Sequence, residues 1–314
     1  MQRILITGGT GMIGKRLTSL LLDKGYEVII LTRDASKYRQ KENEISHERL
    51  SYYEWDPSEK TVEPAAIRNA NVIINLAGAG IADKRWTKKR KRIIVSSRVN
   101  AGETIVKALQ EIPNTINTVI NASAIGWYGD DSVRKSNAPA FVETDPNASQ
   151  YLGITCKAWE DSIEPVKSLG IRLLKFRTGI VLSEEGGALK EFKRPIRFGI
   201  APILGRGDQI ISWIHIDDLC RMFLFAIEQI GLSGVYNAVA PTPVSNKNFM
   251  ISLATKMKSK FFIPFHVPAF LLKLFLGEVS IEVLKSTTVS SEKIKNAGFQ
   301  FIYPSVESAF EELI

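Results

Sequence analysis

A glycine-rich segment near the start of the chain constrains the fold more than any other feature. Residues 7–14, Thr-Gly-Gly-Thr-Gly-Met-Ile-Gly, follow the apolar run Ile4-Leu5-Ile6 and precede an amphipathic stretch. Between a strand and a helix, the first glycine permits a tight turn, the second lets a pyrophosphate approach, and the third lets the helix pack closely. The positive end of the helix then faces the anion. The predicted phosphate-binding residues are Gly8, Thr10, Gly11, Met12, Ile13 and Gly14. The alternative is an ordinary strand–helix turn.

Strand-like and helix-like segments alternate through the first part of the chain. Short apolar runs rich in β-branched residues lie at 3–6, 28–31, 72–76, 118–122 and 172–176. Helical patterns lie between them, at about 12–24, 87–111 and 149–168. This alternation predicts an α/β fold, a doubly wound parallel sheet of the Rossmann type.

The rhythm changes after Arg177, and a proline-bounded segment, Ala240-Pro241-Thr242-Pro243, precedes several short helical patterns. We expect a dinucleotide-binding domain over 1–240, with a substrate-region insertion at about 183–210. A smaller, mainly helical C-terminal domain is expected over 241–314.

Composition narrows the function classes. No N-terminal leader is evident, and the apolar stretch 261–277 is interrupted by proline and lysine and too short to span a bilayer. Cys156 and Cys220 are the only cysteines, which excludes a disulfide scaffold and favours buried free thiols. The net charge of +8 suits an anionic ligand without itself indicating nucleic acid. We expect a cytoplasmic protein with a small-molecule substrate, no metal site, no membrane partner and no nucleic-acid partner. Monomer and homodimer both stay open.

The second predicted strand indicates which dinucleotide binds. Its end reads Thr32-Arg33-Asp34, and NAD sites usually place a carboxylate here on the ribose 2′-hydroxyl. Thr32 takes that acidic position, and Arg33 suits a 2′-phosphate. Asp34 is the counter-argument, but it comes late for the ribose. The strand end therefore favours NADP.

Two further segments extend the predicted cofactor site. Leu76, Ala77 and Gly78 lie at the carboxyl end of the run 72–76, in a segment rich in small residues, where a dinucleotide would lie against the backbone. The basic run Lys84–Arg92 invites a nucleic-acid interpretation. Its continuation has helical spacing, so the solvated start of a long helix is favoured, and Arg98 on that helix is the better candidate for the phosphates.

Candidate catalytic residues follow the run 118–122. Ser123 lies at a strand end, where a nicotinamide and a reacting carbonyl would meet, and is predicted to contact both. Tyr128 would line the same pocket. A capped strand end is the alternative for Ser123.

Taken together, these motifs resemble the short-chain dehydrogenase/reductase superfamily, in its extended, epimerase-like group, and within it the SDR39U1-type epimerase family. The matching segments are 7–14, Asn75-Leu76-Ala77-Gly78, Ser123–Gly129, Trp159-Glu160, Arg177–Leu182 and Trp213–Asp218. The resemblance implies NADP binding through the glycine loop, Thr32-Arg33, Leu76-Ala77, Arg98 and Arg177. It also implies a small C-terminal domain from about residue 262.

The chain departs from the superfamily at its proton relay. Catalytic members use Tyr-x-x-x-Lys, in which the lysine lowers the pKa of the tyrosine. Tyr151 is present, but Thr155 stands four residues later and Lys157 six residues later, pointing elsewhere on a helix. Tyr151 is therefore either a general acid or a plain aromatic residue at a helix start.

Two function classes stay open. The first is an NADP-dependent oxidoreductase or epimerase acting on a small or nucleotide-linked hydroxyl or carbonyl compound, with Ser123 and Tyr128 or Tyr151 as catalytic residues. The second is a non-catalytic NADPH-binding sensor or partner-binding module. A nucleic-acid binder is a distant third.

Overall fold

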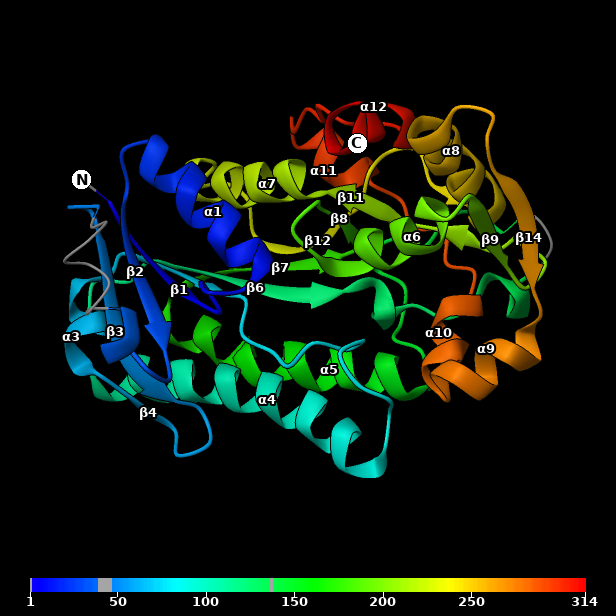
Figure 1. Ribbon diagram of the computed structural model, residues 1–314. Helices are drawn as coiled ribbons and strands as arrows, with labels where there is room; N and C mark the ends of the chain where they lie inside the picture. The colour runs from blue at the N-terminus through cyan, green and yellow to red at the C-terminus, as the bar shows by residue number, and fades with distance from the viewer. Residues whose placement is uncertain (1, 39–46, 136–137) are drawn as a thin grey trace.

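An eight-stranded sheet forms the centre of the computed structural model, which describes residues 2–38, 47–135 and 138–314 (Figure 1). Its strands are β1 (Arg3–Thr7), β2 (Glu27–Thr32), β3 (Leu50–Asp56), β4 (Thr61–Val62), β5 (Val72–Asn75), β6 (Thr118–Ala124), β7 (Arg172–Thr178) and β12 (Gly234–Ala238). Their order is β12-β7-β6-β5-β1-β2-β3-β4, and only the β3–β4 pair is antiparallel. The order reverses between β1 and β5, where ligands bind in doubly wound sheets. The predicted fold class is confirmed.

Helices cover both faces of this sheet (Figure 1). One face carries α1 (Met12–Asp23) and α7 (Ile216–Glu228), and the other carries α3 (Pro64–Asn69), α4 (Lys88–Glu111) and α5 (Tyr151–Ile163). Side chains of β1 alternate between the two cores. Ile4 and Ile6 pack with Leu17 of α1, whereas Leu5 packs with Ile105 of α4. Because both faces are buried, each inner strand reads as a continuous apolar run.

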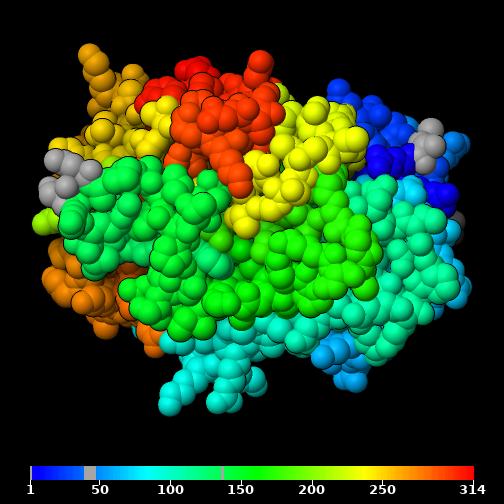
Figure 2. Space-filling model, turned by 180° about the vertical axis from the view of Figure 1, so that it is seen from behind, coloured from blue at the N-terminus to red at the C-terminus, as the bar shows by residue number. Residues whose placement is uncertain are grey.

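Most of the remaining elements build a second region at the end of the molecule away from the N-terminal strands, whereas the short helix α11 (Glu292–Asn296) packs beside β12, with Ile294 in the main core. Its strands are β8 (Ile180–Leu182), β9 (Ile200–Leu204), β10 (Ile210–Ile211), β11 (Trp213–His215), β13 (Val244–Ser245) and β14 (Ile263–Val267). Its helices are α6 (Gly187–Arg197), α8 (Asn246–Lys258), α9 (Ala269–Leu276), α10 (Val279–Leu284) and α12 (Val306–Leu313). Seen from behind, the orange segment near residues 270–285 lies against the green segment that follows β6 (Figure 2).

Helices α6, α8 and α12 share one core. Leu189 of α6, Phe249 of α8 and Phe310 of α12 belong to the same buried cluster. Pairing of β9 with β14 and of β10 with β13 adds backbone hydrogen bonds between the predicted insertion and the C-terminal segment. The domain boundary at residue 240 stays a prediction.

Local chemistry explains where several elements begin and end. The Thr87 side chain accepts a hydrogen bond from the Arg90 backbone N–H and caps α4 at the start of the basic run. The predicted helix over 149–168 is shorter, since Pro165 follows α5 and the chain continues as a 3₁₀ segment, Glu164–Leu169. β3 escaped the apolar-run pattern because its residues, Leu-Ser-Tyr-Tyr-Glu-Trp-Asp, are mostly half-buried near the sheet edge.

No helix in the described part of the chain is long and apolar enough to cross a membrane. Both cysteines are buried and free.

Candidate functional site

The glycine loop connects β1 to α1 at the carboxyl edge of the sheet. Gly8 has a φ of 69°, and a Cβ there would lie 2.9 Å from the carbonyl carbon of Leu76. A Cβ on Gly14 would lie 2.4 Å from the Gly8 carbonyl oxygen. A Cβ on Gly11 would meet only that same oxygen, at 3.3 Å. The fold therefore requires glycine at positions 8 and 14, whereas the missing side chain of Gly11 leaves space beside the loop.

The N-terminus of α1 is free to receive an anion. Gly11 is the N-cap and offers no side-chain cap, and the first turn contains no acidic residue. The backbone N–H groups of Met12 and Ile13 thus lie at the positive end of a helix with no side-chain carboxylate to neutralise it. Phosphate groups bind at such helix ends.

A row of polar side chains crosses the sheet beside this loop. The Thr7 hydroxyl donates to Asn75 Oδ1 at 2.6 Å, and Asn75 Nδ2 donates to Asn121 Oδ1 at 2.6 Å. Backbone N–H groups of Leu76 and Ala77 both donate to Thr7 Oγ1 at 3.2 Å. This row keeps the carboxyl ends of β1, β5 and β6 level, next to the predicted cofactor residues.

The end of β2 presents a cation and turns its carboxylate away. Asp34 accepts hydrogen bonds from the Ser36 hydroxyl at 2.8 Å and the Lys37 backbone N–H at 3.1 Å. The Ser36 hydrogen bond holds the pKa of Asp34 below its usual value. Arg33 is exposed and forms no ion pair with another described residue. Asp34 thus caps the following turn, and Arg33 is left exposed, with only a through-space attraction to the Asp56 carboxylate.

Arg98 is the buried cation of the site. Its side chain lies under Gly78, where a Cβ would approach the guanidinium carbon to 3.0 Å, and over the Trp159 ring at 4.9 Å. Nη1 donates to the carbonyl oxygens of Ala79 at 3.0 Å and Ile94 at 2.9 Å. Burial lowers the pKa of Arg98, and no described carboxylate lies within ion-pair distance of it. A buried guanidinium with only carbonyl partners favours an anion nearby.

Ser123, at the end of β6, is part of a buried ion-pair network. Its hydroxyl donates to Glu160 Oε1 on α5 at 2.8 Å. The same oxygen accepts from Arg177 Nε at 2.8 Å, and Lys175 Nζ lies 3.4 Å from Glu160 Oε2. The Glu160 and Arg177 side chains are each 3% exposed. Although burial opposes its charge, the hydrogen bond to Glu160 leaves the pKa of Arg177 raised.

Tyr128 is locked into the other side of this network. The side chain is fully buried; its hydroxyl donates to Asn237 Oδ1 at 2.6 Å and accepts from Arg177 Nη1 at 3.1 Å. Burial raises the pKa of Tyr128 to about 12. The Arg177 guanidinium also stacks on the Trp127 ring, 3.6 Å from its centroid. The side chains of Arg177 and Tyr128 are therefore held by each other and by buried neighbours, and neither projects into open space.

Tyr151 faces α4, not the end of β6. Its hydroxyl donates to the carbonyl oxygen of Lys91 at 2.9 Å, and its ring packs edge-on against Trp86. The Thr155 hydroxyl donates to the Tyr151 carbonyl oxygen at 2.7 Å. Lys157 points to solvent and pairs with Asp161 at 2.6 Å, in agreement with its predicted direction.

Leu152 and Cys156 occupy the α5 positions that do face the β6 end. A Cβ on Gly126, just after β6, would lie 3.1 Å from Leu152 Cβ and 3.5 Å from Cys156 Sγ. These residues are one helical turn apart, the spacing of the superfamily's tyrosine and lysine, and Glu160 lies one turn further. Burial raises the pKa of Cys156 to about 12. The sequence pattern placed the superfamily pair at Tyr151 and Thr155, one residue earlier along the helix, and the catalytic role of Tyr151 stays a prediction.

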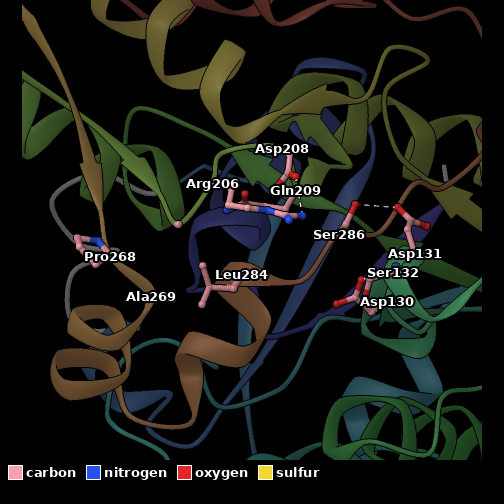
Figure 3. Close-up of a pocket in the computed structure, with 11 residues that line it drawn as sticks. Asp130, Asp131, Ser132, Arg206, Asp208, Gln209, Pro268, Ala269, Leu284 and Ser286 are labelled. Carbon is pink, nitrogen blue, oxygen red and sulfur yellow. Dashed lines mark hydrogen bonds and ion pairs between the residues drawn. The ribbon is translucent and has the colours of Figure 1, made fainter.

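A cavity of about 630 Å³ lies between the loop after β6 and the C-terminal region (Figure 3). Asp130 and Ser132 line one side, and Arg206, Asp208 and Leu284 of α10 lie across from them. The Arg206 guanidinium pairs with Asp208 at 2.8 Å. The cavity lining combines three carboxylates and a guanidinium with apolar side chains of the C-terminal region.

The structure thus brings the predicted residues together in two sets. The glycine loop, Thr32-Arg33, Leu76–Gly78, Arg98 and Ser123 border the carboxyl edge of the sheet around the β1–β5 reversal. Arg177 and Tyr128 lie in the buried network behind Ser123, and Tyr151 lies against α4.

Sequence reasoning assigned no role to Glu160 and none to Leu152. The sequence does contain a pattern that could have indicated them, because Leu152, Cys156 and Glu160 are spaced four residues apart and so share one face of a helix. A glutamate on an otherwise apolar face is a candidate for a buried ion pair.

Comparison with known proteins places this geometry in context. The sequence pattern described as "NAD dependent epimerase/dehydratase family" matches residues 4–152, and a "Domain of unknown function (DUF1731)" matches residues 267–313. The epimerase family protein YfhF of Bacillus subtilis is 35% identical over the whole of this chain and 98% of its own length.

Two solved structures share the fold. The human epimerase family protein SDR39U1 (isoform 2), crystallised with NADPH, has a TM-score of 0.84 and 25% identity and covers 99% of both chains. A UDP-glucuronic acid 4-epimerase from Bacillus cereus, in complex with UDP-glucuronic acid and NAD, has a TM-score of 0.78. Its identity is 20%, with 99% of this chain and 97% of that chain covered, so it supports the fold alone.

Proposed function

The chain belongs to the epimerase family, and from that premise we propose that its cleft binds NADP(H) and serves an oxidoreductase or epimerase reaction. The substrate class is a small or nucleotide-linked hydroxyl or carbonyl compound. NADPH in the human relative SDR39U1 supports this choice of cofactor.

One observation carries the preference for NADP(H) over NAD(H). At the end of β2, the Asp34 carboxylate is engaged by Ser36 and Lys37, whereas Arg33 is exposed and unpaired among the described residues. An NAD site needs a carboxylate on the ribose 2′-hydroxyl, and an NADP site needs a cation for the 2′-phosphate. A guanidinium can bind that phosphate through two hydrogen bonds.

Titration of both cofactors into Arg33→Asp tests the assignment. We expect NADPH affinity to fall at least about tenfold, roughly 1.4 kcal/mol, while NADH affinity changes little or improves. Lys89→Ala, an exposed cation of α4, is the control and should leave both affinities unchanged. Equal losses of NADPH and NADH in Arg33→Asp would contradict the proposal.

Residues of this chain have distinct roles around the cofactor. The α1 amides and Arg98 fit the phosphates, and the level strand ends at Leu76 and Ala77 fit the dinucleotide backbone. NADP(H), when bound, supplies or accepts the hydride. Ser123 then holds the reacting oxygen. Because its hydrogen points at Glu160, its oxygen accepts a hydrogen bond, which favours the hydroxyl form of a substrate.

A specific observation favours a second candidate, a non-catalytic NADP(H)-binding protein. The hydroxyls of Ser123, Tyr128 and Tyr151 all donate to groups within the protein. Apolar Leu152 and Cys156 occupy the helix positions that face β6. No described residue there supplies the tyrosine and lysine of the superfamily relay.

Turnover assays separate the two candidates. NADPH oxidation by the wild-type protein against a carbonyl panel, and NADP⁺ reduction against alcohols, would support the enzyme. The double variant Leu152→Tyr/Cys156→Lys places a tyrosine and a lysine one turn apart toward Ser123, and we expect it to raise slow turnover. Thr155→Lys is the matched control and should not. A gain in Thr155→Lys alone would show that the helix register assigned here is mistaken.

A further inference from the structure

An exposed apolar surface lies at the outer edge of the C-terminal region. There β14 pairs in parallel with β9, with Ile263 opposite Ile200 and Phe265 opposite Pro202. Since side chains two apart on a strand share a face, these four lie on one side of the small sheet. Figure 1 shows β14 at the right-hand margin, away from the glycine loop. The small sheet therefore presents apolar side chains to solvent.

Aromatic residues continue this surface beyond the sheet. Phe198, two residues before Ile200, is 86% exposed, and Phe261, two residues before Ile263, is 85% exposed. The Ile263 backbone N–H donates to the Gly199 carbonyl oxygen at 2.8 Å, so the two entry segments lie side by side.

Helix α9 adds a second element. Its sequence, Ala-Phe-Leu-Leu-Lys-Leu-Phe-Leu, is apolar nearly all round, yet Leu272 is its only buried residue. Phe270, Leu274 and Phe275 are each more than 60% exposed. Helices of this composition normally lie inside a core, whereas α9 leaves most of its apolar side chains exposed. We call the exposed side chains of these elements the phenylalanine surface: Phe198, Ile200, Phe261, Ile263, Phe265, Phe270, Leu274 and Phe275.

Cations gather in the same two segments and in the basic run Lys84–Arg92, whose Arg85 Nη2 donates to the Leu274 carbonyl oxygen of α9 at 3.1 Å. Residues 186–207 and 254–277 contain nine lysines and arginines and one glutamate. Their surplus of eight positive charges equals the net charge of the whole chain, since the other residues carry 32 basic and 32 acidic side chains. Lys260 and Lys273 are exposed and form no ion pair with a described residue. The phenylalanine surface is therefore bordered by cations.

We propose that the phenylalanine surface binds the surface of an anionic lipid bilayer. Exposed phenylalanine and leucine side chains enter the boundary between headgroups and acyl chains, while flanking lysines and arginines contact anionic headgroups. A second copy of the chain fits less well, because a two-fold contact would place the same surplus of cations on both sides. The sequence led us to expect no membrane partner because segment 261–277 is too short to span. Peripheral binding requires no spanning helix.

Vesicle flotation tests this proposal on the full chain. Vesicles of phosphatidylglycerol and phosphatidylcholine should carry the protein upward, vesicles of phosphatidylcholine alone should carry about tenfold less, and about 1 M salt should release most of it. Phe261→Ser/Phe275→Ser should lose at least about tenfold in binding, since both side chains are exposed and the fold does not depend on them.

Charge reversal supplies the matched comparison. Lys260→Glu/Lys273→Glu should abolish binding, whereas Lys24→Glu/Arg68→Glu, an identical charge change at exposed positions near the N-terminal strands, should reduce it less than about twofold. Equal losses in the two double variants would overturn the proposal in favour of general electrostatic attraction. Absence of flotation would also overturn the proposal. A concentration-dependent dimer, seen by light scattering and dissociated by the Phe261→Ser/Phe275→Ser variant, would do the same.

Discussion

Removing the charge of Glu160 should destabilise the protein strongly, because this carboxylate holds the buried network together. Glu160→Gln keeps the shape of the side chain. It leaves Arg177 and Lys175 without their shared anion and points an amide N–H₂ toward groups that can only donate. Breaking a buried pair by removing one partner costs about 3–5 kcal/mol, since the remaining charge stays buried.

Thermal unfolding of the cofactor-free protein is the appropriate assay, because bound NADPH would add its own stabilisation. A chain of this size shifts its Tm by roughly 2 °C per kcal/mol, so Glu160→Gln should lower Tm by about 6–10 °C. Glu164→Gln is the matched control. The Glu164 side chain is 42% exposed and pairs with Lys175 at 2.7 Å, so solvent screens it, and its loss should cost less than about 1 kcal/mol.

The reasoning fails if the two variants lower Tm equally, or if Glu160→Gln changes it by less than about 1 °C. Either result would mean that water reaches the network or that Arg177 finds another partner.

Three further predictions concern other parts of the molecule. Gly14→Ala should lower Tm by several degrees, because its Cβ would overlap the Gly8 carbonyl oxygen, whereas Gly11→Ala should keep the apo fold and weaken NADPH in fluorescence titration. Burial lowers the pKa of His215, so the unfolded state binds its proton first. The free energy of unfolding should be intact above about pH 6.5 and fall as the pH drops from there toward the lower folded-state pKa, by at most about 1.4 kcal/mol per pH unit. In denaturant titrations at several pH values, the free energy of unfolding of His215→Asn should lack this part of the decrease below pH 6.5. Burial raises the pKa of both Cys156 and Cys220 to about 12, so neither thiol should react with a disulfide reagent at pH 8 until the protein unfolds; rapid labelling of the native protein would contradict their burial.

Much of the fold could be predicted from sequence because its parallel strands are buried on both faces. Short continuous apolar runs such as Ile4-Leu5-Ile6 are typical of strands buried on both faces. The glycine loop indicated which of these strands comes first in the fold. β3 was missed for the opposite reason. Near the edge of the sheet its side chains are mostly half-buried, so no hydrophobic period distinguishes it from a loop.

The predicted cofactor positions rest on a stronger sequence signal than the predicted catalytic ones. Loop amides and strand ends bind phosphates through the backbone, so their positions follow from where glycines and strand ends occur. Proton transfer depends on which way a side chain points. Tyr151 and Leu152 are adjacent in sequence, and only the packing of α5 against α4 decides which of them faces Ser123.

That packing also limits how a proton relay could be restored. Tyr128 is close to the cleft in sequence, but its hydroxyl is bound by Asn237 and Arg177, and burial raises its pKa to about 12. Releasing it would require breaking the ion pair between Arg177 and Glu160, with the stability loss described above. A relay is therefore more readily built on the helix face that already points at Ser123. Because the present occupants, Leu152 and Cys156, take no part in the ion pairs of Glu160 with Arg177 and Lys175, replacing them alters the chemistry at the end of β6 without removing those charges.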